Sequence, residues 1–320
     1  MESVLILDTS VGSLNKGDDI IMKCVNMHLM DITKDKFVLT LPTHLQPFSS
    51  FQVFRNSNRI KVYNDATYKF VGGSNLLTMN MLTHFPQWNI NLFNSSPLKG
   101  SVLFGVGAGK GNKINRYTKM LYKKVLSSEH FHSVRDERTK KIMENIGLRA
   151  INTGCPTLWK LTPEHCKRIP TQKSSSVIFT LAHHSKSKED QQLIDILVKN
   201  YEKVYFWVQD ASDLDYFNTL KNIDKVNVVP PTLDDFERVL NNDIDYVGVR
   251  LHGGIYAMRQ LKRTIIISID ERAKGMSETY HLNTIERENI ASLETIIQSK
   301  FETKINLDME SINKWKSQFI

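Results

Sequence analysis

The sequence predicts two α/β domains, each a parallel sheet covered by helices. Short apolar runs alternate with amphipathic helical stretches from end to end, which is typical of chains built from strand–helix units. The length of 320 residues suits two domains of about 150 residues each. A polar stretch at residues 160–176, with two prolines and a serine run, interrupts the alternation and predicts a linker. We expect the two domains to face each other across a cleft.

In the first half, short runs rich in Val, Ile, Leu and Phe predict strands at 3–7, 37–41, 68–71, 102–106, 131–134 and 150–152. Apolar residues at helical spacing predict a helix over 18–30, and two more helices are expected over 117–126 and 136–146. Gly147 follows the last of these as its stop signal. These elements define a first domain over residues 1–165.

The pattern restarts after the linker and defines a second domain over residues 175–305. Its expected strands are 177–181, 204–208, 226–229, 246–249 and 264–269, and its expected helices are 189–200, 214–220, 232–240, 254–259 and 285–300. A last helix in 306–320 carries Ile312, Trp315 and Phe319 on one stripe. We expect that stripe to pack on a domain, with a return to the first domain as one option. The alternative is a membrane-surface anchor.

Composition and charge limit the partners. Lys and Arg number 42 against 34 Asp and Glu, a net charge of +8 that favours anionic partners such as phosphorylated metabolites, nucleotides or lipid phosphates. The basic residues are spread along the chain, which disfavours nucleic acid. No apolar run approaches the roughly 20 residues of a spanning helix, and the N-terminus lacks the basic flank of a signal peptide. We therefore expect a cytoplasmic protein with at most peripheral membrane association.

Metal and disulfide chemistry find little support. The three cysteines form no CxxC pair and are odd in number, so neither a disulfide framework nor a zinc ribbon is expected. The histidines show no HExxH or HxH spacing, so we predict no structural zinc.

Candidate ligand-binding residues follow three strands of the first half. Asn15 and Asp18 lie between the first strand and its helix, where their side chains could bind a sugar or cap the helix and where free backbone amides favour an anion. Gly73 and Asn75 follow the third strand, in a turn that permits close backbone approach. Lys110 lies in a glycine-rich loop after the fourth strand. That loop matches neither the P-loop nor the dinucleotide spacing, but it could still contact an anion.

The sharpest candidates combine guanidinium and imidazole groups. Arg135 ends a strand and offers a planar fork for carboxylate or phosphate, or a salt bridge to a neighbouring acid. Arg250 and His252 lie two apart at the end of another strand, so we expect both side chains to face one way. The helix expected behind Gly253 and Gly254 would expose amides to an anion, and His252 could move protons near neutral pH.

Asp270 and Lys274 follow the last strong strand. They are either part of the same site or an ordinary polar loop. Ligands of open α/β sheets bind at the carboxyl ends of the strands, and every candidate above falls at such an end.

These segments, in this order, resemble the polysaccharide pyruvyl transferase family over residues 3–275. Asn15 to Asp19, Gly72 to Asn75, Val134 to Glu137, Gly154 to Thr157, and above all Arg250-Leu251-His252 with the strand ending in Asp270 and Lys274, carry the resemblance. Two departures concern Ser74, where the family often has a third glycine, and Gly253-Gly254, where a serine is frequent. These departures bear on the identity of the acceptor more than on the fold.

The resemblance implies a GT-B-like fold of two Rossmann-like domains, with the acceptor on the first and the donor on the second. It implies transfer of a pyruvyl group from phosphoenolpyruvate to two hydroxyls of a sugar in a surface polysaccharide or its precursor, leaving a cyclic ketal and phosphate. A lipid-linked acceptor would bring the protein to the inner face of a membrane. No cofactor or metal is implied beyond phosphoenolpyruvate as co-substrate.

Residue roles follow from this match. Arg250 and His252 would be catalytic, with His252 delivering a proton and Asp18 or Asp270 accepting one. The expected donor-binding residues are Arg135, Lys274, Gly253, Gly254 and Lys110, and the expected acceptor-binding residues are Asn15, Asp18, Gly73 and Asn75.

Two other function classes stay open. One is a GT-B glycosyltransferase using a nucleotide sugar, for which Glu271 or Glu278 could bind the ribose. The other is a non-catalytic glycan- or anion-binding paralogue.

Overall fold

The computed structural model describes residues 2–82, 87–111 and 113–319, apart from the side chains of residues 271 and 272. Its contacts divide the chain into two compact units. The N-terminal unit comprises residues 1–13, 21–159 and 308–320, and the C-terminal unit comprises residues 14–20 and 160–307. This division differs from the sequence-based one at residues 160–165, which lie in the C-terminal unit and not in the first domain, and at residues 14–20. Residues 14–20 join the C-terminal unit because Lys16 N donates a hydrogen bond to Gln209 O at 2.8 Å.

The N-terminal unit contains a parallel sheet of order β2-β1-β3-β4. A two-stranded parallel sheet of β5 and β6 continues from it through a bridge between Val106 and Val134. The strands are β1 Ser3–Asp8, β2 Phe37–Pro42, β3 Tyr68–Gly72, β4 Val102–Phe104, β5 His132–Val134 and β6 Ala150–Asn152. Each lies within two residues of a strand expected from the sequence.

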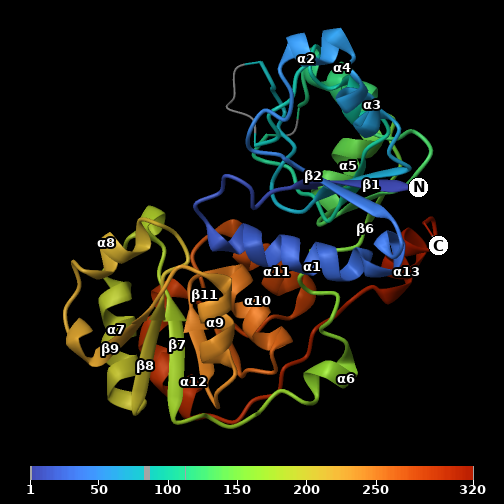
Figure 1. The fold of residues 1–320 in the computed structure, drawn as a ribbon. Coiled ribbons are helices and arrows are strands. Elements are labelled where there is room, and N and C mark those ends of the chain that lie inside the picture. Colours follow the sequence, from blue (N-terminus) through green and yellow to red (C-terminus); the bar gives the residue numbers. More distant parts are fainter. Residues whose placement is uncertain (1, 83–86, 112, 320) are drawn as a thin grey trace. The chain divides into compact units, whose positions relative to one another are not determined.

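Helices cover this sheet (Figure 1): α1 Lys16–Thr33, α2 Ser50–Arg55, α3 Asn58–Asn64, η1 Ser96–Leu98, α4 Arg116–Val125, α5 Glu137–Asn145 and α13 Met309–Lys316. The sequence analysis missed α2 and α3. No residue of α2 is buried, so no apolar period marks it. The available signal was its capping box, in which Ser49 and Gln52 satisfy each other's backbone amides.

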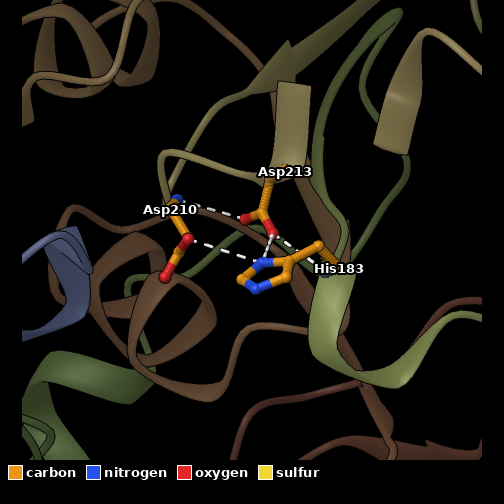
Figure 2. A group of neighbouring side chains, drawn as sticks. All are labelled: His183, Asp210 and Asp213. Atoms are coloured by element: carbon orange, nitrogen blue, oxygen red, sulfur yellow. Dashed lines mark hydrogen bonds and ion pairs between the residues drawn. The ribbon is translucent and has the colours of Figure 1, made fainter. Parts of the chain in front are cut away.

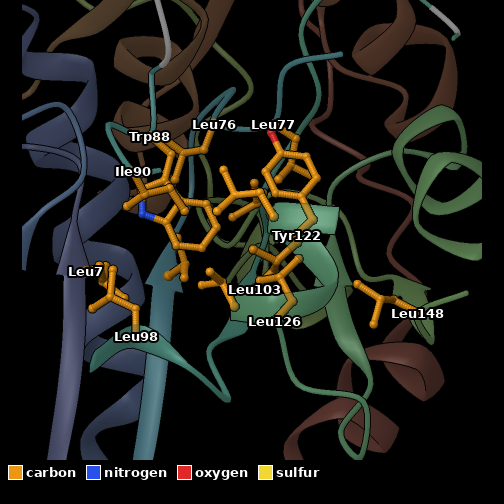
Figure 3. Packing of buried hydrophobic residues seen from close by; sticks show 14 of the residues in the cluster. Leu7, Leu76, Leu77, Trp88, Ile90, Leu98, Leu103, Tyr122, Leu126 and Leu148 are labelled. Atoms are coloured by element: carbon orange, nitrogen blue, oxygen red, sulfur yellow. The ribbon is translucent and has the colours of Figure 1, made fainter. Parts of the chain in front are cut away.

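The core of the N-terminal unit lies on both faces of its sheet. Leu5 and Leu7 of β1 belong to one apolar cluster and Val4 and Ile6 to the other, because side chains alternate along a strand. Figure 3 shows the first cluster, where the stacked rings of Trp88 and Tyr122 have centroids 6.5 Å apart. Burial on both faces explains why β1, β3 and β4 appear in the sequence as continuous apolar runs, whereas the edge strand β2 is mostly exposed.

The C-terminal helix completes the second cluster of the N-terminal unit. Ile312, Trp315 and Phe319 are all buried there. Trp315 packs on Phe104 with ring centroids 4.5 Å apart. The apolar stripe is therefore used inside the protein and is unavailable to a membrane surface.

The C-terminal unit contains a six-stranded parallel sheet of order β12-β11-β10-β7-β8-β9. Its strands are β7 Ser176–Thr180, β8 Lys203–Trp207, β9 Val226–Val229, β10 Asp245–Gly248, β11 Thr264–Ser268 and β12 Thr284–Glu286. The order places β10 beside β7 although many residues separate them in the sequence. This adjacency positions the site described below.

The helices of the C-terminal unit are α6 Pro163–Cys166, η2 His183–Ser185, α7 Glu189–Asn200, α8 Asp213–Phe217, η3 Ile223–Lys225, α9 Leu233–Leu240, α10 Leu251–Arg259, α11 Glu271–Tyr280, η4 Arg287–Ser292 and α12 Leu293–Gln298. Two expectations were wrong. Helix α10 begins at Leu251 instead of residue 254, and β12 occupies residues where a helix was expected to begin. Helix α11 was not expected. Within the described residues, no helix is long and apolar enough to cross a bilayer.

Candidate active site

Charged side chains gather at the carboxyl edge of the C-terminal sheet. Three neighbouring strands, β10, β7 and β8, end there. Arg250 follows β10, His183 follows β7, and Asp210 and Asp213 follow β8. This edge is where ligands of open parallel sheets bind.

Asp213 is the centre of this group and is fully buried. Arg250 Nη2 donates to both of its carboxylate oxygens at 2.6 Å. The backbone amides of His183 and Asp210 donate to it at 2.9 and 3.1 Å. Figure 2 shows the imidazole of His183 on the same carboxylate, with Nδ1 3.1 Å from Asp213 Oδ1. One carboxylate therefore orients both a guanidinium and an imidazole.

The imidazole of His183 is held from one side. Asp210 Oδ1 lies 3.4 Å from Nδ1, so both neighbouring carboxylates face the same ring nitrogen. A proton on Nδ1 satisfies them and leaves Nε2 pointing away from them (Figure 2). The His183 side chain is 30% exposed. This arrangement suits proton transfer at Nε2.

The same three residues have ligand atoms that could hold a metal. Atoms of His183, Asp210 and Asp213 lie within 4.8 Å of one another. However, both oxygens of Asp213 already accept hydrogen bonds from Arg250. A divalent cation there would share its carboxylate with a guanidinium charge, so the donor set fits an oriented histidine better than a metal.

Arg250 and His252 do not follow the strand geometry expected from the sequence. Strand β10 ends at Gly248, Arg250 occupies the N-cap of α10, and His252 lies in its first turn. Helical side chains two apart diverge by about 200°, so strand alternation does not make these two face one way. Both are buried, Arg250 to 6% exposure and His252 to 9%. Arg250 Nε also donates to Leu181 O at 2.9 Å. The three bonds of Arg250 described here use Nε and Nη2 but not Nη1.

Gly253 and Gly254 serve close packing. A Cβ on Gly254 would lie 2.6 Å from Ile266, and one on Gly253 would lie 2.9 Å from Tyr246 Oη. Because α10 begins early, Gly254 N donates to Arg250 O at 3.1 Å. The prediction that this amide is exposed to an anion is therefore wrong.

Tyr246 and Thr180 fix the turn that carries Arg250. Tyr246 Oη donates to Arg250 O at 2.9 Å and lies 2.7 Å from Thr180 Oγ1. Arg250 N donates to the same Thr180 hydroxyl at 3.2 Å. Burial raises the pKa of the Tyr246 phenol, which stays a neutral donor. Neither residue was expected from the sequence.

Asn15 lies in the C-terminal unit, beside Gln209. Its Oδ1 accepts from Gly17 N at 2.9 Å and from Gln209 Nε2 at 3.1 Å. Asn15, and not Asp18, thus precedes the first helical residue of α1, whereas Asp18 lies in the first turn. Gln209 Oε1 is buried and has no hydrogen-bond partner among the described residues. Gln209 directly precedes Asp210 and is a site candidate that sequence reasoning missed, because nothing local distinguishes it.

The structure brings Asn75 and Arg135 together in the N-terminal unit. A Cβ on Gly107 would lie 2.4 Å from Arg135 Nε and 2.7 Å from Asn75 Oδ1. In the part of the chain that the structure describes, the buried Asn75 Oδ1 has no hydrogen-bond partner. Arg135 Nε also lies 3.4 Å from Asp136 Oδ2, the neighbouring acid considered as its alternative partner.

Gly73 and Lys110 have other surroundings. Gly73 has φ +54°, and a Cβ there would lie 2.0 Å from Ile21 of α1, so the glycine permits helix packing. Lys110 is exposed. Arg138 holds its loop by donating to Ala108 O at 3.0 Å and to Gly109 O at 2.5 Å.

Asp270 and Lys274 line a cavity of about 500 Å³ in the C-terminal unit. The cavity lies where β11 and β12 end, along the same sheet edge as Asp213. Asp270 Oδ1 caps α11 by accepting from Ala273 N at 2.8 Å, and Lys274 Nζ lies 4.0 Å from Glu286. The other lining residues are Ser187, Glu189, Ser268, Ile269, Arg287 and Glu288. The ribose candidate Glu278 is exposed, and the side chain of Glu271 lies outside the described residues.

The chain is similar to solved structures. The chain is similar to S. aureus MnaA, solved with UDP, at 10% identity and a TM-score of 0.50, over 99% of this chain and 91% of that one. It is also similar to the UDP-GlcNAc 2-epimerase of Neisseria meningitidis, solved with UDP-GlcNAc, at 13% identity and a TM-score of 0.47, over 100% and 94% of the two chains. The first likeness confirms the predicted α/β fold with parallel sheets as GT-B-like.

Family membership comes from the sequence itself. No curated protein matches the chain. The family model of polysaccharide pyruvyl transferase matches residues 15–271, which is well over half of the chain. The match includes both the Asn15 loop and the Arg250 turn described above. The resemblance is thereby confirmed, and the chain belongs to the polysaccharide pyruvyl transferase family and is a transferase.

Proposed function

We propose that this transferase moves the pyruvyl group of phosphoenolpyruvate onto two hydroxyls of a saccharide. The two hydroxyl oxygens bond to C2 of the donor, and the bond between C2 and the phosphate oxygen breaks. The methylene carbon C3 gains a proton and becomes the methyl group of the ketal. The two hydroxyl groups release two protons. C3 gains one proton, and the inorganic phosphate leaves with the other.

The hydrogen-bonded chain from His183 through Asp213 to Arg250 carries this proposal. The donor has a carboxylate and a phosphate, which a guanidinium binds well. Asp213 and Leu181 O hold Arg250 through Nε and Nη2, so that, within the described part of the chain, Nη1 remains for a substrate anion. The reaction also needs proton transfer, for which Asp213 orients His183 at the same sheet edge.

Two histidines divide the proton transfers in this proposal. His252 delivers the proton to C3, as the family match on Arg250-Leu251-His252 implies. His183 takes a hydroxyl proton at Nε2, and Asp213 stabilises the imidazolium that forms. The sequence had suggested Asp18 or Asp270 as the base. Asp270 has weaker support because it caps a helix, and Asp18 lies in the first turn of α1. The scheme uses phosphoenolpyruvate as co-substrate and routes no step through a resident cofactor or metal.

The cavity around Lys274 suits hydroxyls better than a multiply charged donor. Glu189, Asp270, Glu286 and Glu288 line it, against the two cations Lys274 and Arg287. Carboxylates accept hydrogen bonds from sugar hydroxyls and repel phosphate. We therefore assign the donor to Arg250 and regard Lys274 as the weaker donor-binding candidate. The same reasoning allows saccharide hydroxyls to bind in the C-terminal unit.

Phosphate release tests the proposed reaction. Phosphoenolpyruvate is incubated with a panel of saccharide acceptors, and mass spectrometry detects the added pyruvyl group. His252→Ala should lower turnover by about 10²- to 10⁴-fold with the fold intact, and near-normal turnover contradicts its role. A thermal-shift panel tests the alternatives. Stabilisation by nucleotide sugars alone favours a glycosyltransferase, and phosphoenolpyruvate binding without phosphate release favours a non-catalytic paralogue.

A further inference from the structure

Acidic residues are almost missing from one long segment of the N-terminal unit. Residues 36–128 contain twelve Lys and Arg and a single acid, Asp65. The remaining 30 of the 42 basic residues therefore stand against 33 of the 34 acids. The net positive charge of the chain resides in this segment. The basic residues alone, which are spread along the chain, conceal this asymmetry.

The cations of this segment reach the surface on neighbouring elements. Helices α2, α3 and α4 lie together in Figure 1. Lys69 Nζ joins α3 to the residue after η1 by donating to Asn64 O and Lys99 O at 2.9 Å. Lys124 Nζ of α4 donates to Leu92 O at 2.6 Å. We define the basic face as six of the exposed cations on or next to these helices: Arg55, Arg59, Lys61, Lys99, Lys123 and Lys124.

Large aromatic side chains project from the same elements. Phe51 and Phe54 of α2 are 66% and 88% exposed, and Phe93, beside Leu92, is 76% exposed. No residue of α2 is buried, so its apolar side chains do not contribute to the core. The Arg55 guanidinium lies 5.6 Å from the centre of the Phe51 ring. Exposed Phe beside exposed Arg and Lys is the pattern of a membrane-surface contact.

We propose that the basic face and its three phenylalanines bind the surface of an anionic lipid bilayer. The cations contact lipid phosphates, and the Phe side chains enter the boundary between headgroups and acyl chains. Nucleic acid fits less well. Aromatic residues that stack on bases usually form part of a groove or sheet platform, whereas Phe54 has 88% of its surface in solvent.

This inference does not depend on the reaction proposed above. It uses no residue of the candidate active site and assigns the membrane contact to α2, α3 and α4 instead of α13. A saccharide acceptor carried on a lipid would give the contact a purpose, but the binding itself can be measured without any acceptor.

Co-sedimentation of the full chain with vesicles tests the proposal. One set of vesicles is phosphatidylcholine alone, and the other contains about one third phosphatidylglycerol. We expect binding to the anionic vesicles only, weakening as salt rises. Arg59→Gln with Lys61→Gln should weaken it about 25-fold, since each cation near such a surface contributes about a fivefold factor. Phe51→Ser with Phe54→Ser should weaken it at least about tenfold.

Lys221→Gln with Lys225→Gln is the matched control. It removes two exposed cations from the C-terminal unit and should leave vesicle binding unchanged. Circular dichroism and thermal midpoints establish that each variant is folded. Three results overturn the proposal: no binding of the natural chain to anionic vesicles, equal binding by the Phe51/Phe54 variant, or tighter binding to single- or double-stranded DNA than to vesicles.

Discussion

The two units place different chemistry at the ends of their parallel strands. In the C-terminal unit, charged side chains form buried pairs, among them Arg250 with Asp213 and Arg287 with Asp190. In the N-terminal unit, Gly73 and Gly107 allow α1, Asn75 and Arg135 to approach the backbone closely. Buried pairs fix charged groups in position, whereas glycines fix the packing of the chain. This difference is the reason why we propose the C-terminal edge, and not the N-terminal one, for proton and anion chemistry.

A buried ion pair alone does not mark the site. Arg263 pairs with Asp245 at 2.9 Å, and both side chains are as buried as those of Arg250 and Asp213. However, Arg263 also donates to carbonyls at the end of α12, and Asp245 accepts from Tyr201 at 2.8 Å. That pair holds helix to sheet. Only the Asp213 pair also orients a partly exposed histidine, so these two pairs form a matched test.

The largest effect is expected for Asp213→Asn. The change leaves Arg250 charged and unpaired in a buried site, which should lower the free energy of unfolding by about 3–5 kcal/mol. It also releases His183, so turnover should fall by at least about 10³-fold. Denaturant unfolding and steady-state kinetics measure the two effects.

Asp245→Asn is the control for that variant. It breaks a pair of equal burial and should destabilise the fold to a similar degree, but turnover of the folded fraction should stay near normal. Equal turnover losses in the two variants would contradict the assignment of Asp213 to the site.

His183→Ala separates an oriented histidine from its neighbour. Turnover should fall by about 10²- to 10⁴-fold, because Nε2 is the proposed proton acceptor. His184→Ala is the matched control, since that ring adjoins His183 at a centroid distance of 5.5 Å but makes no bond to Asp213. If the two variants have the same kcat, His183 has no role in proton transfer.

In the N-terminal unit, the close approach of α1 predicts a stability effect. Gly73→Ala places a methyl group 2.0 Å from Ile21 at a positive φ and should cost about 3 kcal/mol. Gly100→Ala also has a positive φ, but apart from its own chain neighbours no described atom lies within 4 Å of its Cβ, so it should cost about 1 kcal/mol. Urea unfolding compares them, and equal losses would show that packing at Gly73 is unimportant.

The smallest expected effect is a pH dependence of the free energy of unfolding, caused by a histidine of the N-terminal unit. Burial lowers the pKa of His132 to about 4, and the neutral ring accepts from Leu103 N and donates to Ser127 O. Below about pH 6.5 the unfolded chain binds a proton that the folded chain does not. Stability should therefore fall between pH 6.5 and 4, by about 2 kcal/mol at pH 5. Urea unfolding of His132→Gln at pH 7 and pH 5 should show that this loss of stability has disappeared. If the variant loses as much stability as the natural chain, another group is responsible for the pH dependence.

The sequence by itself determined the alternation of strands and helices, because burial on both faces of a parallel sheet leaves local apolar runs. It also determined the family, through short motifs such as Arg250-Leu251-His252. It misplaced the start of α10, because two consecutive glycines oppose a helix by propensity and are accommodated there only through packing on Tyr246 and Ile266.

Only the tertiary structure decided which residues meet at the site. Asp213 lies 37 residues from Arg250 and 30 from His183, and their contact depends on the strand order β10-β7-β8. No local pattern encodes that order, since apolar runs identify strands without naming their neighbours. The same holds for Asn15, whose partner Gln209 is 194 residues away. The apolar pattern that predicts a strand or helix is contained in a short stretch of sequence, whereas the contacts between distant residues form only when distant segments pack.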